Sequence, residues 1–222
     1  MSVARNRVLW LHFGGGNLRE WSLFTATTAA PRPRRLRFLV RDVDSDAPIV
    51  LGEGEWTRDA AFLPYAVERE VTVLHSSGAR AFRWEAPARV TALGAKYGGV
   101  AVALEDGRIV VLSLLLKGPE SSWAGSPAAD AVFLTGNGVA AQRGRTVEMR
   151  TGSGTRRWLL PPDGHLSDAD GYRAVYVSRG RVKLLHLDSG RTRDLGRGSD
   201  AQLEYSTVAI AAGRHVRFVR IR

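Results

Sequence analysis

The chain has 222 residues, of which 44% are apolar and 24% are charged, a composition typical of a folded domain. The absence of cysteine excludes a disulfide framework, thiolate metal sites and cysteine nucleophiles. No window approaches the roughly 18 apolar residues that a membrane helix needs, and no secretory leader is visible. We therefore expect a soluble monomer, cytoplasmic by default.

The formal net charge of +10 comes almost entirely from arginine. Only Lys96, Lys117 and Lys183 are lysines, so 29 of the 32 basic residues are arginines. Such a bias is typical of a GC-rich genome, and no basic run is longer than two residues. We therefore expect a protein, a peptide or an anionic ligand as partner, and not a nucleic acid.

Residues 1–60 begin with a predicted β-hairpin. Arg7–Phe13 and Glu20–Ala26 are apolar-rich runs on either side of the glycine-rich segment 14–17. A further apolar run, Arg35–Val40, follows a bend that contains two prolines. This region is less regular than the rest of the chain.

From residue 61 onward, one short strand pattern recurs at nearly constant spacing. Taking Val71 as the reference, we place the equivalent positions at Ile109, Thr146, Val182 and Val216, in steps of 38, 37, 36 and 34 residues. A fixed period of this size predicts a chain built from one small unit, each unit packing against its neighbours. The five segments are Glu70–Leu74, Arg108–Leu112, Arg145–Met149, Arg181–Leu185 and His215–Val219.

Each of these segments is the second half of a predicted β-hairpin, and further strands lie on both sides of it. The clearest hairpin joins Gly99–Leu104 to Arg108–Leu112 through Glu105–Gly107. A preceding strand is predicted in four units, and second turns at Ser77–Gly78, Thr151–Gly154 and Ser189–Gly190 lead into a following strand, which makes four strands per unit. The preceding strands are Arg89–Leu93, Ala131–Leu134, Leu166–Ala169 and Gln202–Tyr205, and examples of the following strand are Ala79–Trp84 and Thr155–Leu160.

Four short strands in roughly 36 residues, without helix signals, predict an all-β propeller. Two units also share a Ser/Thr-Gly turn followed by a strand that carries tryptophan, His75–Trp84 and Arg150–Trp158. This pattern resembles the blades of PQQ-like and WD40-like propellers, and it is similar to uncharacterised bacterial propeller proteins. The resemblance covers about residues 60–222 and implies a fold, with no PQQ cofactor.

The number of blades depends on how residues 1–60 are aligned with the repeat. Either Leu36, 35 residues before Val71, lies in the equivalent strand, or Glu20–Ala26 is that strand. Both alternatives give six four-stranded blades in one domain, 1–222, with an irregular first blade (1–60) and regular repeats (61–222). Five or seven blades, or an open slice of a larger propeller, are the alternatives. A closed ring requires the N-terminal residues to supply the outermost strand of the last blade.

Arginine is concentrated in the turns between the second and third strands of the blades. Since these turns emerge on one face of a propeller, we expect a ring of guanidinium groups suited to carboxylates or phosphates. Exposed turns also collect charge without any ligand. The candidate binding residues are Arg69, Arg108, Arg143, Arg145, Arg179, Arg181 and Arg214.

Two other patterns suggest metal sites, and both have simpler interpretations. Asp42, Asp44, Asp46 and Glu53 match ligand positions of a calcium loop, but Ala47 and Pro48 stand where the sharp turn needs glycine. Three histidines follow apolar strands in equivalent positions of different units, too far apart to share one ion. We expect no metal or cofactor; the histidines are His12, His75 and His186.

The sequence contains no nucleophile elbow, phosphate loop or metalloprotease helix. Glu68, Glu70, Glu105 and Asp106 form the one acidic cluster in equivalent turns. We therefore predict a non-catalytic propeller scaffold that binds a protein, a peptide or an anionic ligand. The alternative is a propeller-type hydrolase that acts on an anionic substrate.

Overall fold

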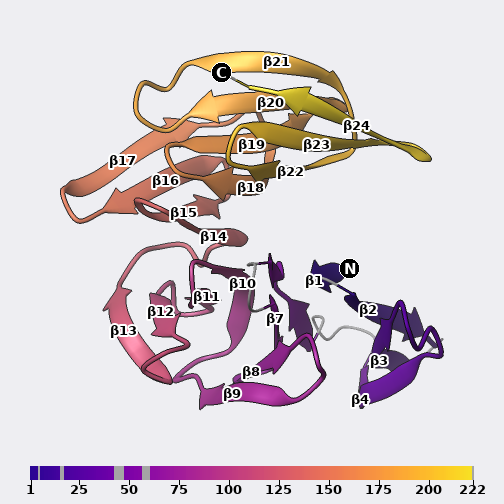
Figure 1. The fold of residues 1–222 in the computed structure, drawn as a ribbon. Coiled ribbons are helices and arrows are strands. Elements are labelled where there is room, and N and C mark those ends of the chain that lie inside the picture. Colours follow the sequence, from indigo (N-terminus) through magenta and orange to yellow (C-terminus); the bar gives the residue numbers. More distant parts are fainter. Residues whose placement is uncertain (5, 16–17, 43–47, 57–60, 222) are drawn as a thin grey trace. The chain divides into compact units, whose positions relative to one another are not determined.

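The computed structural model describes residues 1–4, 6–15, 18–42, 48–56 and 61–221. These residues form 24 strands and no helix, so the all-β prediction is confirmed. Accordingly, none of the described residues belongs to a helix that could cross a bilayer. The chain divides into two compact units, 1–128 and 129–222, and each is described by itself (Figure 1). The single domain 1–222 stays a prediction.

Unit 1 contains three antiparallel sheets, numbered here in chain order. The first sheet is β1 (Ser2–Ala4), β2 (Arg7–Gly14), β3 (Leu18–Thr27) and β4 (Arg34–Asp42). The second is β5 (Ile49–Leu51), β6 (Glu55–Trp56), β7 (Ala61–Val67), β8 (Glu70–His75) and β9 (Arg80–Glu85). The third is β10 (Val90–Lys96), β11 (Gly99–Leu104), β12 (Ile109–Ser113) and β13 (Gly118–Trp123).

Unit 2 contains the other three sheets, all antiparallel meanders. The fourth sheet is β14 (Ala131–Thr135), β15 (Gly138–Arg143), β16 (Thr146–Thr151) and β17 (Gly154–Leu159). The fifth is β18 (His165–Asp170), β19 (Arg173–Ser178), β20 (Arg181–His186) and β21 (Thr192–Arg197). The sixth has three strands among the described residues: β22 (Asp200–Glu204), β23 (Thr207–Ala212) and β24 (His215–Arg220).

The first sheet decides between the two alignments of residues 1–60. Its third strand, β3, contains Glu20–Ala26, whereas Leu36 lies in the outer strand β4. The alignment through Glu20–Ala26 is therefore correct. At the other edge of this sheet, β1 pairs with β2, with Ser2 opposite Leu9. The N-terminal strand thus belongs to the first sheet.

The third strands of the sheets begin at the same point relative to the preceding turn. This common register shows that one position assigned from the sequence is wrong. Thr146 closes a two-residue turn opposite Arg143, just as Arg181 closes a turn opposite Ser178. The residue equivalent to Val71 and Val182 is therefore Val147, not Thr146. Alternation of side chains across a strand makes this single step matter, because it exchanges the buried and the exposed face.

Each unit has apolar cores between successive sheets. In unit 1, Leu9 and Leu23 of the first sheet pack with Leu63 of the second, and Val71 of the second sheet packs with Val102 of the third. These side chains are fully buried. Because each sheet buries apolar side chains against the next one, the strands carry the regular apolar pattern seen in the sequence.

Unit 2 repeats this arrangement. Val147 and Met149 of the fourth sheet pack with Leu185 of the fifth, and Val182 and Leu184 of the fifth sheet belong to the core that the sixth sheet completes. Burying one such side chain contributes roughly 1.5–3 kcal/mol. The repeated cores account for the stability of a chain without helices among its described residues.

Buried carboxylates connect the first strands of the fifth and sixth sheets. Asp168, 3% exposed, accepts the backbone N–H of Leu203 at 2.7 Å, and Asp170 accepts that of Tyr205 at 2.9 Å. A buried carboxylate is tolerated where donors satisfy it. These two aspartates therefore have a structural role within unit 2.

Candidate functional site

Arg69 and Arg145, two of the predicted binding arginines, use their guanidinium groups to hold an outer strand. Arg69 Nε donates to the carbonyl of Ala86 at 2.8 Å, and Arg145 Nε donates to the carbonyl of Leu160 at 3.1 Å. Arg69 also lies 3.6 Å from a carboxylate oxygen of Glu85. Both arginines occupy the second position of a two-residue turn before the third strand. The same hydrogen bond to a carbonyl at the end of the outer strand is therefore found in the second and the fourth sheet.

Two other arginines form forked ion pairs with a neighbouring aspartate. Arg108 donates to Asp106 from Nε at 2.7 Å, and Arg181 donates to Asp194 from Nε at 2.7 Å and from Nη2 at 2.9 Å. These hydrogen bonds lower the pKa of Asp106 and of Asp194 and raise the pKa of both guanidinium groups. The guanidinium groups of Arg108 and Arg181 therefore already use some of their N–H donors on aspartates of the same chain.

Arg143 is buried, contrary to what a binding face requires. Its side chain is 5% exposed and donates from Nε to Glu148 at 3.0 Å. Glu148 also accepts a longer contact from Arg157, at 3.4 Å. This pair lies inside the fourth sheet and cannot contact a ligand without unfolding locally.

Arg179 and Arg214 differ from the other five. Both are exposed, and among the described contacts neither guanidinium has a hydrogen bond or an ion pair. Arg179 sits in a left-handed turn (φ 51°), where its backbone N–H donates to Asp163 and lowers the pKa of that carboxyl. The structure thus leaves two of the seven predicted arginines with free guanidinium groups.

The acidic residues of the equivalent turns are also engaged by arginines. Glu70 accepts from Arg37 at 2.9 Å and from Arg83, and Glu105 accepts from Arg89 at 2.9 Å. Glu68 pairs with Arg41 at 3.1 Å. In the described geometry these carboxylates are partners of arginines, and each occupies its own turn or strand.

The proposed calcium loop lies partly outside the described residues. Asp44 and Asp46 are not described, whereas Asp42 ends β4 and Glu53 forms a bridge with Gly94. Within the described ranges, no group of three or more histidine or acidic side chains could hold a metal ion. The histidines make local contacts, such as that of His75 Nδ1 with the Ser77 hydroxyl at 2.9 Å.

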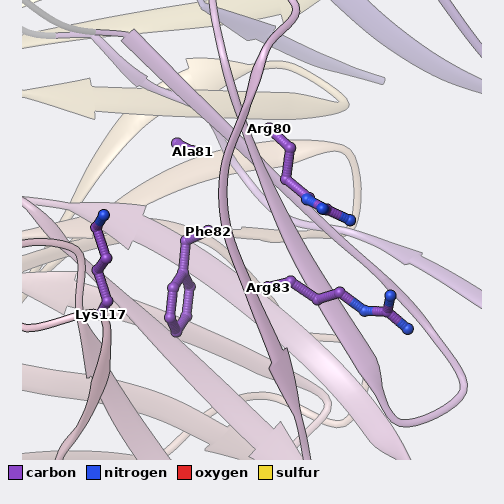
Figure 2. Close-up of a pocket in the computed structure, with 5 residues that line it drawn as sticks. All are labelled: Arg80, Ala81, Phe82, Arg83 and Lys117. Carbon is purple, nitrogen blue, oxygen red and sulfur yellow. The ribbon is translucent and has the colours of Figure 1, made fainter.

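The structure adds a basic hollow that the sequence pattern does not mark. It has a volume of about 340 Å³ and is widely open to solvent. Strand β9 and the turn before β13 form it, and Figure 2 shows its lining residues, Arg80, Ala81, Phe82, Arg83 and Lys117. Only the alternation of arginine with apolar residues in β9 could have indicated it from sequence.

The three cationic side chains of this hollow differ in whether an acidic side chain neutralises their charge. Arg83 pairs with Glu70, whereas Arg80 and Lys117 are exposed and make no hydrogen bond or ion pair among the described residues. Phe82 is 7% exposed and anchors the strand in the core below. A left-handed turn (φ 54°) positions Lys117, and the Ser113 hydroxyl accepts the N–H of Leu116 in the same turn.

Solved structures similar to this chain are β-propeller proteins. U3-55K shares 12% identity over 97% of this chain and 80% of its own, with a TM-score of 0.58. Hsv2 of Kluyveromyces lactis shares 11% over 79% and 60%, with a TM-score of 0.59, and the Swd1 propeller domain of Myceliophteria thermophila shares 12% over 74% and 62%, with a TM-score of 0.52. No protein-family model and no curated protein matches the chain. These likenesses show a propeller-like fold.

Proposed function

We propose that this chain is a non-catalytic interaction scaffold whose six sheets are the blades of a propeller, and that it binds an acidic segment of a partner protein. The observation that carries the proposal is the basic hollow. Arg80 and Lys117 present positive charge without an internal counterion, so their potential is available to a ligand. The hollow is open and shallow, which suits a length of extended chain better than an enclosed small molecule.

The paired turn arginines support the same interpretation by contrast. Because Arg108 and Arg181 are bound to aspartates, a ligand that uses them must displace an internal ion pair. An acidic segment at Arg80 and Lys117 displaces nothing. Arg179 remains a second candidate contact from the predicted arginine face, since its guanidinium is exposed.

Binding of a labelled octaglutamate peptide, followed by fluorescence anisotropy at low salt, tests this proposal. Replacing both Arg80 and Lys117 with serine should weaken binding at least about tenfold, because two uncompensated charges are lost. Replacing Arg191 and Arg193 of unit 2 with serine removes the same net charge and should change affinity less than about twofold. Equal affinities of the two variants would contradict a specific basic hollow.

A second arm of the experiment separates a protein partner from a nucleic acid. A single-stranded octanucleotide is measured under the same conditions. The proposal requires the peptide to compete successfully against it at about 0.15 M salt, where non-specific phosphate contacts are weakened. Tighter binding of the oligonucleotide, lost in the Arg80 and Lys117 variant, would assign the hollow to nucleic acid instead.

A further inference from the structure

The turn that carries Lys117 has an equivalent turn in unit 2, and the two differ in chemistry. Segments 114–117 and 187–190 lie between the third and the outer strand of their sheets, β12 and β13 in unit 1, β20 and β21 in unit 2. The leading leucine of each segment donates its backbone N–H to the turn between the first two strands, at 3.0 Å and 2.7 Å. The two segments therefore match residue for residue, with Leu-Leu-Leu-Lys in one and Leu-Asp-Ser-Gly in the other.

In unit 2 this turn packs directly on the outer strand of the preceding sheet. Arg156 of β17 donates from Nη1 to the carbonyl of Asp188 at 2.7 Å. Gly190, with a positive φ of 72°, lies so close to Trp158 that an added Cβ would be 2.7 Å from Cδ1 and Nε1 of the ring. Glycine is therefore the residue that fits this contact without displacing the tryptophan.

In unit 1 the basic hollow lies where these two contacts are found in unit 2. Phe82 has the strand position of Arg156, two residues before the tryptophan, and a phenylalanine cannot donate to the turn carbonyl. Lys117 has the position of Gly190 and carries a side chain there. The hollow between β9 and Lys117 thus follows from two differences within one repeated arrangement (Figure 2).

Lys117 also has a backbone conformation that is unfavourable for a residue with a Cβ. Its φ is 54°, and its side chain makes no hydrogen bond or ion pair among the described residues, so no such contact offsets the strain. Strain of this kind is typical of residues that hold a ligand. Two-residue hairpin turns require a positive φ at their first residue, which explains the other four described non-glycine residues with one: Glu68, Tyr97, Arg179 and Tyr205.

The same turn exposes two leucines where its equivalent has polar residues. Leu115 and Leu116 are 88% and 69% exposed, and neither belongs to the described apolar cores of unit 1. Asp188 and Ser189 hold these positions in unit 2, as is typical of turns. Neighbouring large apolar side chains on a turn are a mark of a binding surface. Because they directly precede Lys117, apolar and cationic groups meet at one place.

These groups together indicate the chemistry of the ligand. Figure 2 shows Phe82 between Lys117 and the two arginines of β9. A ligand with carboxylates alone would leave the leucines uncovered, and an uncharged apolar ligand would leave the cations uncompensated. A flat membrane surface could contact the leucines, but it would not fill a hollow of about 340 Å³. An extended segment with both kinds of side chain matches all of these groups.

We infer that the basic hollow and the pair Leu115 and Leu116 form one docking site, and that its ligand carries large apolar residues next to its acidic ones. This specifies the acidic segment of the proposed function and rests on that function, which by itself requires only the acidic residues. The carboxylates pair with Arg80 and Lys117, and the apolar side chains cover the two leucines. Lys117 joins the two parts of the site.

Two labelled octapeptides of equal charge test this inference by fluorescence anisotropy. One has two central leucines between three glutamates on each side, and the other has serines in place of the leucines. The leucine peptide should bind about tenfold more tightly because it covers apolar surface. A variant with Leu115→Asn and Leu116→Ser, which gives the turn the polar character of its equivalent, should lose this preference. Its affinity for octaglutamate should not change.

Lys117→Gly tests the meaning of the strain. Glycine relieves the left-handed backbone, so the midpoint of thermal unfolding should rise by about 2–4 °C. Loss of the cation should weaken binding of the leucine peptide at least about threefold. Tyr205→Gly, at a φ of 50° in unit 2, is the matched control: it relieves similar strain and should leave binding unchanged. A fall in the midpoint for Lys117→Gly would assign the lysine a structural role and contradict the inference.

Two further results would overturn the inference, and each leaves a different conclusion about the proposed function. Equal affinities of the leucine and serine peptides, with octaglutamate still bound through Arg80 and Lys117, would remove the apolar part of the site and leave the proposed function standing. The other result is cosedimentation with vesicles of phosphatidylserine and phosphatidylcholine that the double leucine variant abolishes, without any binding of the peptides. It would assign the turn to a membrane surface and contradict both proposals.

Discussion

The third strands of the fifth and sixth sheets have the same design and different surroundings. Val182 and Leu184 of β20 are 0% and 1% exposed, between a neighbouring strand on each side and the sixth sheet above. Val216 and Phe218 of β24 hold the equivalent positions and, within unit 2, belong to none of its described apolar cores. One strand pattern therefore lines an apolar core where another sheet of the same unit packs against it, and takes no part in such a core in the last sheet of unit 2.

The largest difference in unfolding free energy is expected between the ion pair of Glu148, the residue after Val147 in β16, and Arg217, the residue after Val216 in β24. Arg143→Ala would leave the buried Glu148 of β16 with only its longer contact to Arg157, and removing one partner of a buried pair typically costs about 3–5 kcal/mol. Arg217→Ala, at the position of β24 equivalent to Glu148, should cost less, about 1–2 kcal/mol, because that side chain is exposed and gives up only its hydrogen bonds to the carbonyls of Leu195 and Arg197. Urea unfolding of the two variants measures both values, and equal costs would contradict the comparison.

The next effect concerns apolar side chains. Leu184→Ala should lower the free energy of unfolding by about 2–5 kcal/mol, since it opens a cavity in the core of the fifth and sixth sheets. Phe218→Ala should change it by less than about 0.5 kcal/mol, because Phe218 belongs to none of the described apolar cores of unit 2. The same urea measurement applies. A large cost at Phe218 would mean that the side chain is buried in solution.

A smaller effect comes from the outer strand β21, which has no equivalent in the sixth sheet among the described residues. The ion pair with Arg181 lowers the pKa of Asp194 below its ordinary value of 3.8. A lowered pKa in the folded state stabilises the fold above pH 3.8, and this contribution is lost as the pH falls through the lowered value. Asp194→Asn should therefore flatten the loss of stability between about pH 4 and 2. An unchanged acid profile would show that the pair has no energetic role.

The sequence predicts the sheets well because each apolar strand and its turn are local features. The strand Gly99–Leu104 is confirmed with its bounds unchanged as β11, and its hairpin partner, predicted as Arg108–Leu112, is β12 (Ile109–Ser113). The position of Val147 was misjudged by one residue, because a two-residue turn beginning at Gly144 is not distinguishable from a longer one by spacing alone. Register depends on pairing between strands, which a linear pattern does not contain.

The candidate site was harder to predict for a physical reason. Counting arginines in turns identifies charge but not its partner, and five of seven guanidinium groups turned out to hold carbonyls or carboxylates of the same chain. Lys117 lies outside the repeated turns, and Arg80 contributes to the hollow only because β9 is an outer strand. The hollow thus joins segments distant in sequence, and even a local partner such as Asp106 of Arg108 cannot be told from a free carboxylate by spacing alone.

Hydrogen exchange of the backbone amides, resolved by residue with NMR, tests the central claim about β24 most directly. The amides of Val216, Phe218 and Arg220 should exchange rapidly, whereas the alternate amides of Arg217, Val219 and Ile221, which face β23, should be protected. The amides of β16 and β20 should be protected at every position. Slow exchange at Val216, Phe218 and Arg220 in the isolated protein would show that a strand already occupies this edge and would contradict the account.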